Sequence, residues 1–170
     1  MDNQWHILGA GSIGSLFAAA LSDAGCSTTL IIRNNVEESD NTEPPGTFYL
    51  HQNGQQRKFV LPVSPAREDN YISHLLLTTK AYDAGAALAG IAHRLDERSN
   101  ILILANGMGV LEELKAEISY PRYYCGTTTE GAYRQSSKEY IHAGSGVTKI
   151  GGGTSATPPA WFNQWQKLTL

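Results

Sequence analysis

The chain has 170 residues, of which 41% are hydrophobic and 17% are charged, and its formal net charge is -3. This composition excludes an intrinsically disordered chain, and the length is sufficient for one domain with a buried core. The slightly acidic balance argues against a nucleic-acid-binding domain, which would carry clustered Lys and Arg. No apolar run reaches the roughly 18–20 residues of a membrane helix, and the amino terminus lacks the features of a signal peptide. We therefore expect a cytoplasmic protein with no nucleic-acid or membrane partner.

The beginning of the chain predicts a strand, a glycine-rich turn, a helix and a second strand. The apolar run at residues 5–8 is long enough only for a strand and leads into Gly9-Ala10-Gly11-Ser12-Ile13-Gly14. Apolar side chains then recur at helical spacing up to Ala24, and Gly25 is suited to end this helix in the left-handed conformation. A β-branched strand follows at residues 27–32. Together these elements form a βαβ unit, which implies a parallel sheet.

The remainder of the chain predicts further short strands and helices. After a loop at 33–46, two strands at 47–52 and 56–63 flank Asn53-Gly54, a pair typical of a type I′ hairpin turn. Further strands are predicted at 71–79, 101–104, 123–127, 139–142 and 147–150. Helices are predicted at 82–95 and 110–118 and, after a linker at 151–157, at 158–168. The predicted fold class is α/β: a Rossmann-type doubly wound sheet, mostly parallel, with a β-rich carboxyl-terminal portion.

The glycines of the first turn have the spacing of a dinucleotide-binding fingerprint, and they stand in the context that such a fingerprint requires. Gly9 permits the tight turn, Gly11 lets the backbone approach the pyrophosphate, and Gly14 packs the helix against the strand. The pyrophosphate would lie at the positive end of the helix, where free N–H groups point toward it. We predict that Gly9–Gly14 bind a dinucleotide; a plain βα turn is the alternative.

The residue after the second strand favours NADP over NAD. An NAD enzyme usually carries Asp or Glu at this place, where the carboxylate holds the ribose 2′-hydroxyl. Here Arg33 follows the strand, and no acid appears before Glu37. A guanidinium is a planar fork of donors suited to a phosphate, so we predict that Arg33 binds the 2′-phosphate of NADP. A solvated surface arginine is the alternative.

Two polar residues follow predicted buried strands. Lys80 and Asn106 each stand at a carboxyl end, and in a doubly wound sheet these ends line the ligand crevice. Lys80 could meet a phosphate or a carboxylate there. The amide of Asn106 both donates and accepts, which suits a nicotinamide amide or a substrate carbonyl. The alternatives are a solvated lysine at a helix start and a turn-forming asparagine.

The other reactive residue types form no recognisable site in the sequence. The five histidines lack the spacing of metal ligands, and the two cysteines make no CxxC pair, so we expect no metal site. Glu130 ends another predicted strand, and we interpret it as solvated rather than catalytic.

Taken together, the motifs resemble the amino-terminal domain of ketopantoate reductases (2-dehydropantoate 2-reductases). The resemblance covers residues 4 to about 152 and rests on the GxGxxG, on Arg33 and on four segments: Thr78-Thr79-Lys80-Ala81-Tyr82, Asn106-Gly107-Met108-Gly109, Gly126-Thr127-Thr128-Thr129 and His142-x-Gly144-x-Gly146. It implies NADPH-dependent reduction of 2-dehydropantoate to (R)-pantoate in pantothenate biosynthesis, with a 2-oxo acid as substrate.

The resemblance also implies roles for single residues. Gly9 to Gly14 cradle the pyrophosphate, Arg33 takes the 2′-phosphate, and Lys80 lies beside the cofactor. Asn106 contacts both nicotinamide and substrate. Ala132 contacts the cofactor through its backbone. Glu130 falls where the family varies, and no role is assigned to it.

Members of this family are about twice as long and carry a second, helical domain with the proton-donating lysine. We interpret residues 1–170 as the NADP-binding Rossmann domain, with the helical carboxyl-terminal domain absent from this chain. The family lysine lies in a Trp-x-Lys-Leu segment, which Trp165-Gln166-Lys167-Leu168 resembles. This segment begins only 14 residues after Gly151, too early for the family pattern. Lys167 is therefore interpreted as a surface lysine, and the isolated chain as incomplete or inactive.

Two other functions stay open at this point. The chain could be a non-catalytic NADPH-binding module that senses the cofactor, or part of a reductase of another 2-oxo acid. The sequence does not indicate the oligomeric state, so a homo-oligomer stays open as well.

Overall fold

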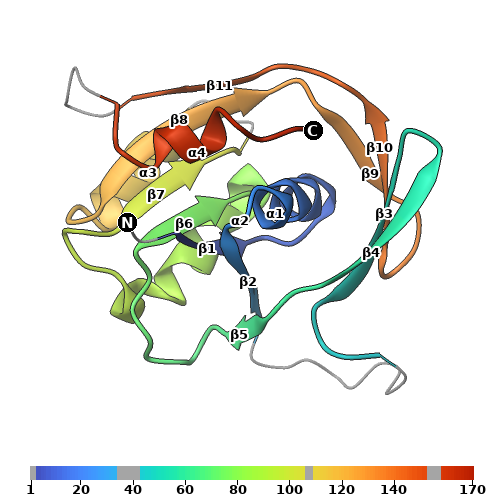
Figure 1. The fold of residues 1–170 in the computed structure, drawn as a ribbon. Helices are drawn as coiled ribbons and strands as arrows, with labels where there is room; N and C mark the ends of the chain where they lie inside the picture. The colour runs from blue at the N-terminus through green and yellow to red at the C-terminus, as the bar shows by residue number, and fades with distance from the viewer. Residues whose placement is uncertain (1–2, 34–42, 106–108, 153–157) are drawn as a thin grey trace.

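A computed structural model describes residues 3–33, 43–105, 109–152 and 158–170. In these ranges the chain forms two β-sheets with one helix between them (Figure 1). Sheet A has the spatial order β11 (Thr148–Gly151), β8 (Arg122–Thr128), β7 (Asn100–Ile103), β6 (His74–Leu77), β1 (Gln4–Leu8), β2 (Ser27–Ile32) and β5 (Val63–Pro65). Sheet B has the order β4 (Gln55–Val60), β3 (Thr47–Gln52), β10 (Glu139–Gly144) and β9 (Gly131–Arg134).

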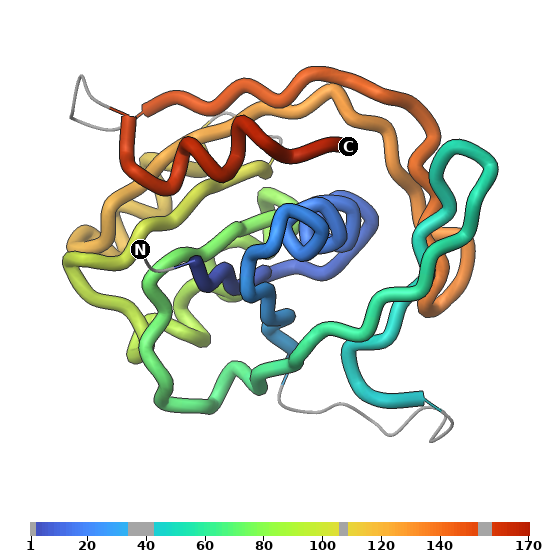
Figure 2. Tube along the Cα trace, in the orientation of Figure 1, coloured from blue at the N-terminus to red at the C-terminus, as the bar shows by residue number. Residues whose placement is uncertain are grey.

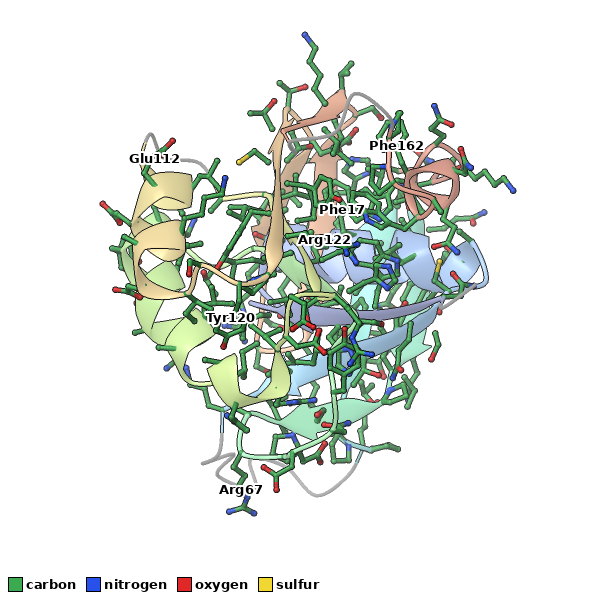
Figure 3. All side chains as sticks on the ribbon, turned by 90° about the vertical axis from the view of Figure 1, so that its left-hand side faces the viewer. Phe17, Arg67, Glu112, Tyr120, Arg122 and Phe162 are labelled. Carbon is green, nitrogen blue, oxygen red and sulfur yellow. The ribbon has the colours of Figure 1, made fainter. Side chains whose placement is uncertain are left out.

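Helices cover both faces of sheet A, whose strands are parallel except for β11. The helices α1 (Ser12–Asp23) and α4 (Phe162–Trp165) lie on one face, while α2 (Ala81–Ala89) and α3 (Val110–Glu117) lie on the other (Figures 1 and 3). Each face has its own cluster of buried apolar side chains. The prediction of a doubly wound α/β fold is therefore confirmed. Within the described ranges, no helix is long and apolar enough to cross a membrane.

Helix α1 is enclosed on two sides, because sheet A packs against one side and sheet B against the other. All eight residues from Gly14 to Leu21 are buried, which is typical of a helix with apolar surroundings all round. The small side chains of Ala18, Ala19 and Ala20 allow close packing at its centre. The amino end of α1 is consequently fixed in position by both sheets.

Several predicted elements differ in extent from the observed ones. The helix predicted at 82–95 ends before Gly90, a poor helix former, and a short 3-10 turn at Ala92–Arg94 follows. The strand predicted at 56–63 ends at Val60, because Pro62 has no N–H for the ladder, and the chain then enters sheet A as β5. The helix predicted at 158–168 is only the single turn α4.

Sheet B is the largest feature that the sequence did not predict. The hairpin β3–β4 turns at Asn53 and Gly54, whose φ angles of 53° and 75° fit the predicted type I′ turn. Strand β3 then pairs in parallel with β10, where Tyr49 lies opposite Glu139. Strand β9, also not predicted, pairs with β10 on its other side. Figure 2 shows these segments, distant in sequence, running side by side next to α1.

An aromatic cluster holds the carboxyl-terminal segment on sheet A, beside α1. The ring centroid of Trp5 in β1 lies 5.4 Å from that of Trp161 and 5.2 Å from that of Trp165. Phe17 of α1 stacks on Trp165 at 5.6 Å. Such pairs add to the free energy of apolar burial, so α4 is well anchored although it is one turn long.

Candidate cofactor site

The register of sheet A brings the carboxyl ends of its central strands to one edge. Leu8 of β1 lies opposite Ile31 of β2 and Leu77 of β6, and Leu77 lies opposite Ile103 of β7. The segments that follow these strands therefore meet at this edge. They include the turn after β1, the residue Arg33 after β2, and Thr78–Lys80 after β6. In open parallel sheets, this edge is where ligands bind.

The three fingerprint glycines face three different surroundings. Gly9 has a φ of +106°, and a Cβ on it would lie 2.6 Å from the backbone nitrogen of Thr79. A Cβ on Gly14 would lie 2.1 Å from the carbonyl oxygen of Gly9, so helix and turn are in direct contact. A Cβ on Gly11 would meet no atom within 4 Å. Gly9 and Gly14 thus serve packing, whereas Gly11 leaves open space beside its Cα, through which a ligand can approach the first turn of α1.

The amino end of α1 also has an electrostatic potential that favours an anion. Gly11 is the N-cap residue, and it provides no side chain to bond the N–H groups of the first turn. These groups have no partner within a helix and carry the positive end of the helix dipole. An anionic group near Gly11 would find both donors and a favourable potential. The residues present therefore fit the pyrophosphate of a dinucleotide.

Two hydroxyl groups hold the turn in this shape. Thr78 Oγ1 donates a 2.7 Å hydrogen bond to the carbonyl oxygen of Gly9, and Tyr140 Oη donates one of 3.1 Å to that of Ala10. Sequence reasoning assigned neither residue this function. The signal for Thr78 was its place at the end of a buried strand. Nothing local could have indicated Tyr140, which comes from sheet B.

The two cations predicted to bind the cofactor lie at the same sheet edge as the turn. Arg33 directly follows β2 and is exposed. Lys80 is the N-cap residue of α2, in an extended conformation, and is exposed as well. Asn106 lies outside the described residues; the half-buried Ala105 before it follows β7 toward the same edge. Whether these three residues bind a cofactor stays a prediction.

Two further residues named by the resemblance lie in different places. Ala132 is half-buried on β9, opposite His142 of β10, and therefore belongs to the sheet that flanks α1 from the other side. Lys167 is exposed and lines a hollow with Asp23 and Arg57. Asp23 is the last residue of α1, so Lys167 lies near the opposite end of this helix from the glycine turn.

The prediction that Glu130 is solvated is wrong. Its side chain is 4% exposed, and its Oε2 lies 2.8 Å from Nε2 of His142, which is equally buried. The turn after β8 packs closely against the loop between β10 and β11. A Cβ on Gly146 in this loop would lie 2.5 Å from the backbone nitrogen of Glu130. The turn therefore directs the side chain of Glu130 into the protein, where it bonds to His142. The sequence analysis assigned no function to this histidine.

The sheet order and the glycine turn define a Rossmann-type domain of the kind found in oxidoreductases. Residues 5–154 match the family described as ketopantoate reductase PanE/ApbA. The chain therefore belongs to the ketopantoate reductase family.

Two curated relatives carry names from this family. The chain is 29% identical over 164 residues to a probable 2-dehydropantoate 2-reductase of Schizosaccharomyces pombe, covering 88% of this chain and 47% of the relative. It is also 29% identical over 149 residues to the 2-dehydropantoate 2-reductase of Vibrio cholerae, covering 85% of this chain and 46% of the relative. The chain thus spans about half the length of these relatives.

Solved structures share the fold. A probable 2-dehydropantoate 2-reductase from Bacillus subtilis superposes with a TM-score of 0.79 at 23% identity, over 98% of this chain and 55% of that one. A D-mandelate dehydrogenase, solved with NADH and anilino(oxo)acetate, superposes with a TM-score of 0.71 at 22% identity, over 86% of this chain and 47% of that one.

Proposed function

We propose that this chain is the NADPH-binding half of a 2-dehydropantoate 2-reductase, which reduces 2-dehydropantoate to (R)-pantoate. The observation that carries the proposal is the open amino end of α1 at Gly11, which lies at the same sheet edge as the cations Arg33 and Lys80. The names of the curated relatives support the choice of substrate. Family membership supports a reductase over a sensor module.

In this proposal, each predicted residue binds a different part of the cofactor or the substrate. The free N–H groups in the first turn of α1 bind the pyrophosphate, to which Gly11 gives close access, and Arg33 binds the 2′-phosphate through its guanidinium fork. Lys80 adds a second positive charge beside the cofactor. Asn106 orients nicotinamide and substrate, and the backbone of Ala132 contacts the cofactor from sheet B. When bound, NADPH supplies the hydride.

The reduction also needs a proton donor, because a ketone that accepts hydride develops negative charge on its oxygen. The position of Lys167, near the far end of α1, does not suit this task. We infer that a second, helical half supplies the donor and the contacts to the substrate carboxylate. Loss of one such donor commonly lowers a rate about 10²- to 10³-fold. The chain alone should consequently bind NADPH and turn over poorly or not at all.

Thermal-shift titration and NADPH oxidation, measured side by side, test this proposal. NADPH at about 100 times its Kd should stabilise the fold by about 2.7 kcal/mol, because it binds only the folded state. Oxidation with 2-dehydropantoate should stay at background until the second half of a relative is added. Binding without turnover even then would favour the sensor module. Turnover of about 1–10³ per second by the chain alone, abolished in Lys167→Ala, would refute the incomplete site.

A further inference from the structure

Glu130 and His142 form a buried pair at the carboxyl edge of sheet A. Glu130 comes two residues after β8, and its Oε2 accepts a 2.8 Å hydrogen bond from Nε2 of His142 on β10. Each of the two side chains is 4% exposed. In every other salt-bridge contact between described residues, both side chains are at least 20% exposed. The proposed function so far gives no part to this pair.

The burial of the pair suits it to fix geometry rather than to add stability. Removal of such polar groups from water is costly, and their mutual attraction often does little more than offset that cost. A hydrogen bond is directional, however, so it sets the position of the segment after β8 relative to β10. Loss of one partner would leave the other buried and unsatisfied.

Strand β10 connects this pair to the glycine turn. Tyr140 and His142 are two residues apart on this strand, so their side chains leave the same face. Tyr140 bonds to the carbonyl oxygen of Ala10 in the turn, and His142 bonds to Glu130. One face of β10 therefore holds both the backbone before α1 and the segment after β8. Figure 1 shows the chain passing through this segment from β8 in sheet A to β9 in sheet B.

The order of sheet A indicates which half of the cofactor lies near this segment. Strand β2 lies on one side of β1, and β6, β7 and β8 follow on the other side. With the 2′-phosphate on Arg33 after β2 and the pyrophosphate at the amino end of α1, the adenosine half lies on the β2 side. The nicotinamide half then extends toward the ends of β7 and β8. The pair of Glu130 and His142 is consequently on the nicotinamide side.

We propose that Glu130 and His142 are positioning residues for the nicotinamide half of NADPH. The proposal rests on the proposed function, because it requires the cofactor at this edge. Neither side chain contacts the cofactor, since the two are buried and bonded to each other. Their bond instead holds β9 and β10 at a fixed distance from the glycine turn. Ala132 of β9, which the proposed function gives to the cofactor, lies opposite His142.

Titration with NADPH and with adenosine 2′,5′-bisphosphate, which lacks the nicotinamide half, tests this role. Glu130→Met keeps the size of the side chain and leaves His142 unsatisfied, so it should weaken NADPH binding about 10-fold. Affinity for the bisphosphate should change by less than about twofold, because its site is distant from the pair. Glu130→Gln should retain most of the NADPH affinity, because its amide oxygen still accepts the bond from His142.

A double variant separates positioning from stability. Replacement of both partners by apolar groups can be nearly neutral, so Glu130→Met combined with His142→Leu should unfold in urea like the wild type. Apolar contact is non-directional, so the double variant should still bind NADPH as weakly as Glu130→Met. Glu139→Met is the control: Glu139 lies 3.8 Å from His51 in a partly exposed pair of the same sheet. It should leave both affinities unchanged.

Equal losses for NADPH and the bisphosphate in Glu130→Met would indicate a merely structural role and overturn the proposal. Wild-type affinity for NADPH in the double variant would also overturn it, and this result can be obtained even if Glu130→Met does not fold. A wild-type chain that binds neither compound would instead refute the proposed function, and the positioning role with it.

Discussion

Tyr140 and Ala10 join the two sheets across the amino end of α1. The phenol of Tyr140, a buried residue of β10, donates a 3.1 Å hydrogen bond to the carbonyl oxygen of Ala10. The N–H of the same peptide unit, which belongs to Gly11, donates a 2.7 Å bond to the carbonyl oxygen of Gly9. This peptide plane is therefore held at both ends, which fixes the backbone at the predicted pyrophosphate site.

Removal of this hydroxyl should loosen the turn. We expect Tyr140→Phe to lower the free energy of unfolding by about 0.5–1.5 kcal/mol and to weaken NADPH binding several-fold. Urea unfolding and fluorescence titration measure the two effects. Tyr133→Phe is the matched control, because Tyr133 lies on the neighbouring strand and is 52% exposed. Unchanged NADPH affinity in Tyr140→Phe would show that the bond does not shape the site.

The glycines Gly11 and Gly14 should separate binding from folding. Gly11→Ala adds a methyl group in open space, so the fold should keep its stability while NADPH binding falls about 10-fold or more through obstruction. In Gly14→Ala the same methyl group would meet the carbonyl oxygen of Gly9 and the hydroxyl of Thr78, at a cost of about 1–3 kcal/mol or more. Circular dichroism during urea unfolding, followed by cofactor titration, distinguishes them. The reverse pattern would contradict the assignment of these glycines.

Arg33 should determine the preference for the phosphorylated cofactor. Because charge-assisted hydrogen bonds contribute about 1.5–3 kcal/mol, Arg33→Ala should weaken NADPH binding about 10- to 150-fold and leave NADH binding nearly unchanged. Arg122→Ala is the control, since Arg122 is an exposed arginine at the beginning of β8, away from the carboxyl edge. Equal losses for both cofactors would mean that Arg33 does not recognise the 2′-phosphate.

Acid should destabilise the protein partly through Glu43. Lys58 and Tyr49 donate to this carboxylate at 2.8 and 2.5 Å and hold its pKa at about 2. A carboxyl whose pKa is lowered by folding stabilises the fold above its unfolded pKa of about 4.3, and this contribution disappears as the pH falls toward 2. The stability difference between wild type and Glu43→Gln should therefore shrink from pH 5 to pH 2 in chemical unfolding. A constant difference would exclude this linkage.

High pH should also destabilise the protein, through the buried phenol of Tyr123. Burial raises the pKa of this phenol to about 12, and its hydroxyl donates a 2.7 Å hydrogen bond to the carbonyl oxygen of Ile118. The neutral phenol stabilises the fold below the unfolded pKa of about 10, and this contribution is lost between pH 10 and 12. Tyr123→Phe should be less stable than wild type by about 1 kcal/mol at pH 7, with a smaller loss above pH 10. Tyr82→Phe is the control, because Tyr82 is 84% exposed.

Features that depend on neighbouring residues were predictable from the sequence. Helix α1 follows from its apolar spacing, and Gly25, with a φ of +79°, ends it as predicted. The fingerprint turn could be located because each glycine has a local steric reason. Sheet B could not be predicted, because the pairing of Tyr49 with Glu139 depends on where the whole chain places two distant segments.

The burial of Glu130 escaped prediction for the same reason. Its partner His142 lies on a strand that arrives from another direction, and the polar residues around Glu130 are typical of a solvated turn. The length of α4 also depends on distant contacts. Pro158 suits the first turn of a longer helix, yet the rings of Trp161 and Trp165 pack on Trp5 within a single turn.

The parallel pairing of β3 with β10 has a consequence for the order in which the protein is made. A ribosome completes α1 and the hairpin β3–β4 long before it reaches β10. At about 5–20 residues per second, this interval is on the order of 10 s. During it the outer side of α1 and the open edge of β3 lack their final cover. Exposed apolar surface and unpaired strand edges promote aggregation, so the nascent chain should need chaperone protection until β10 is synthesised.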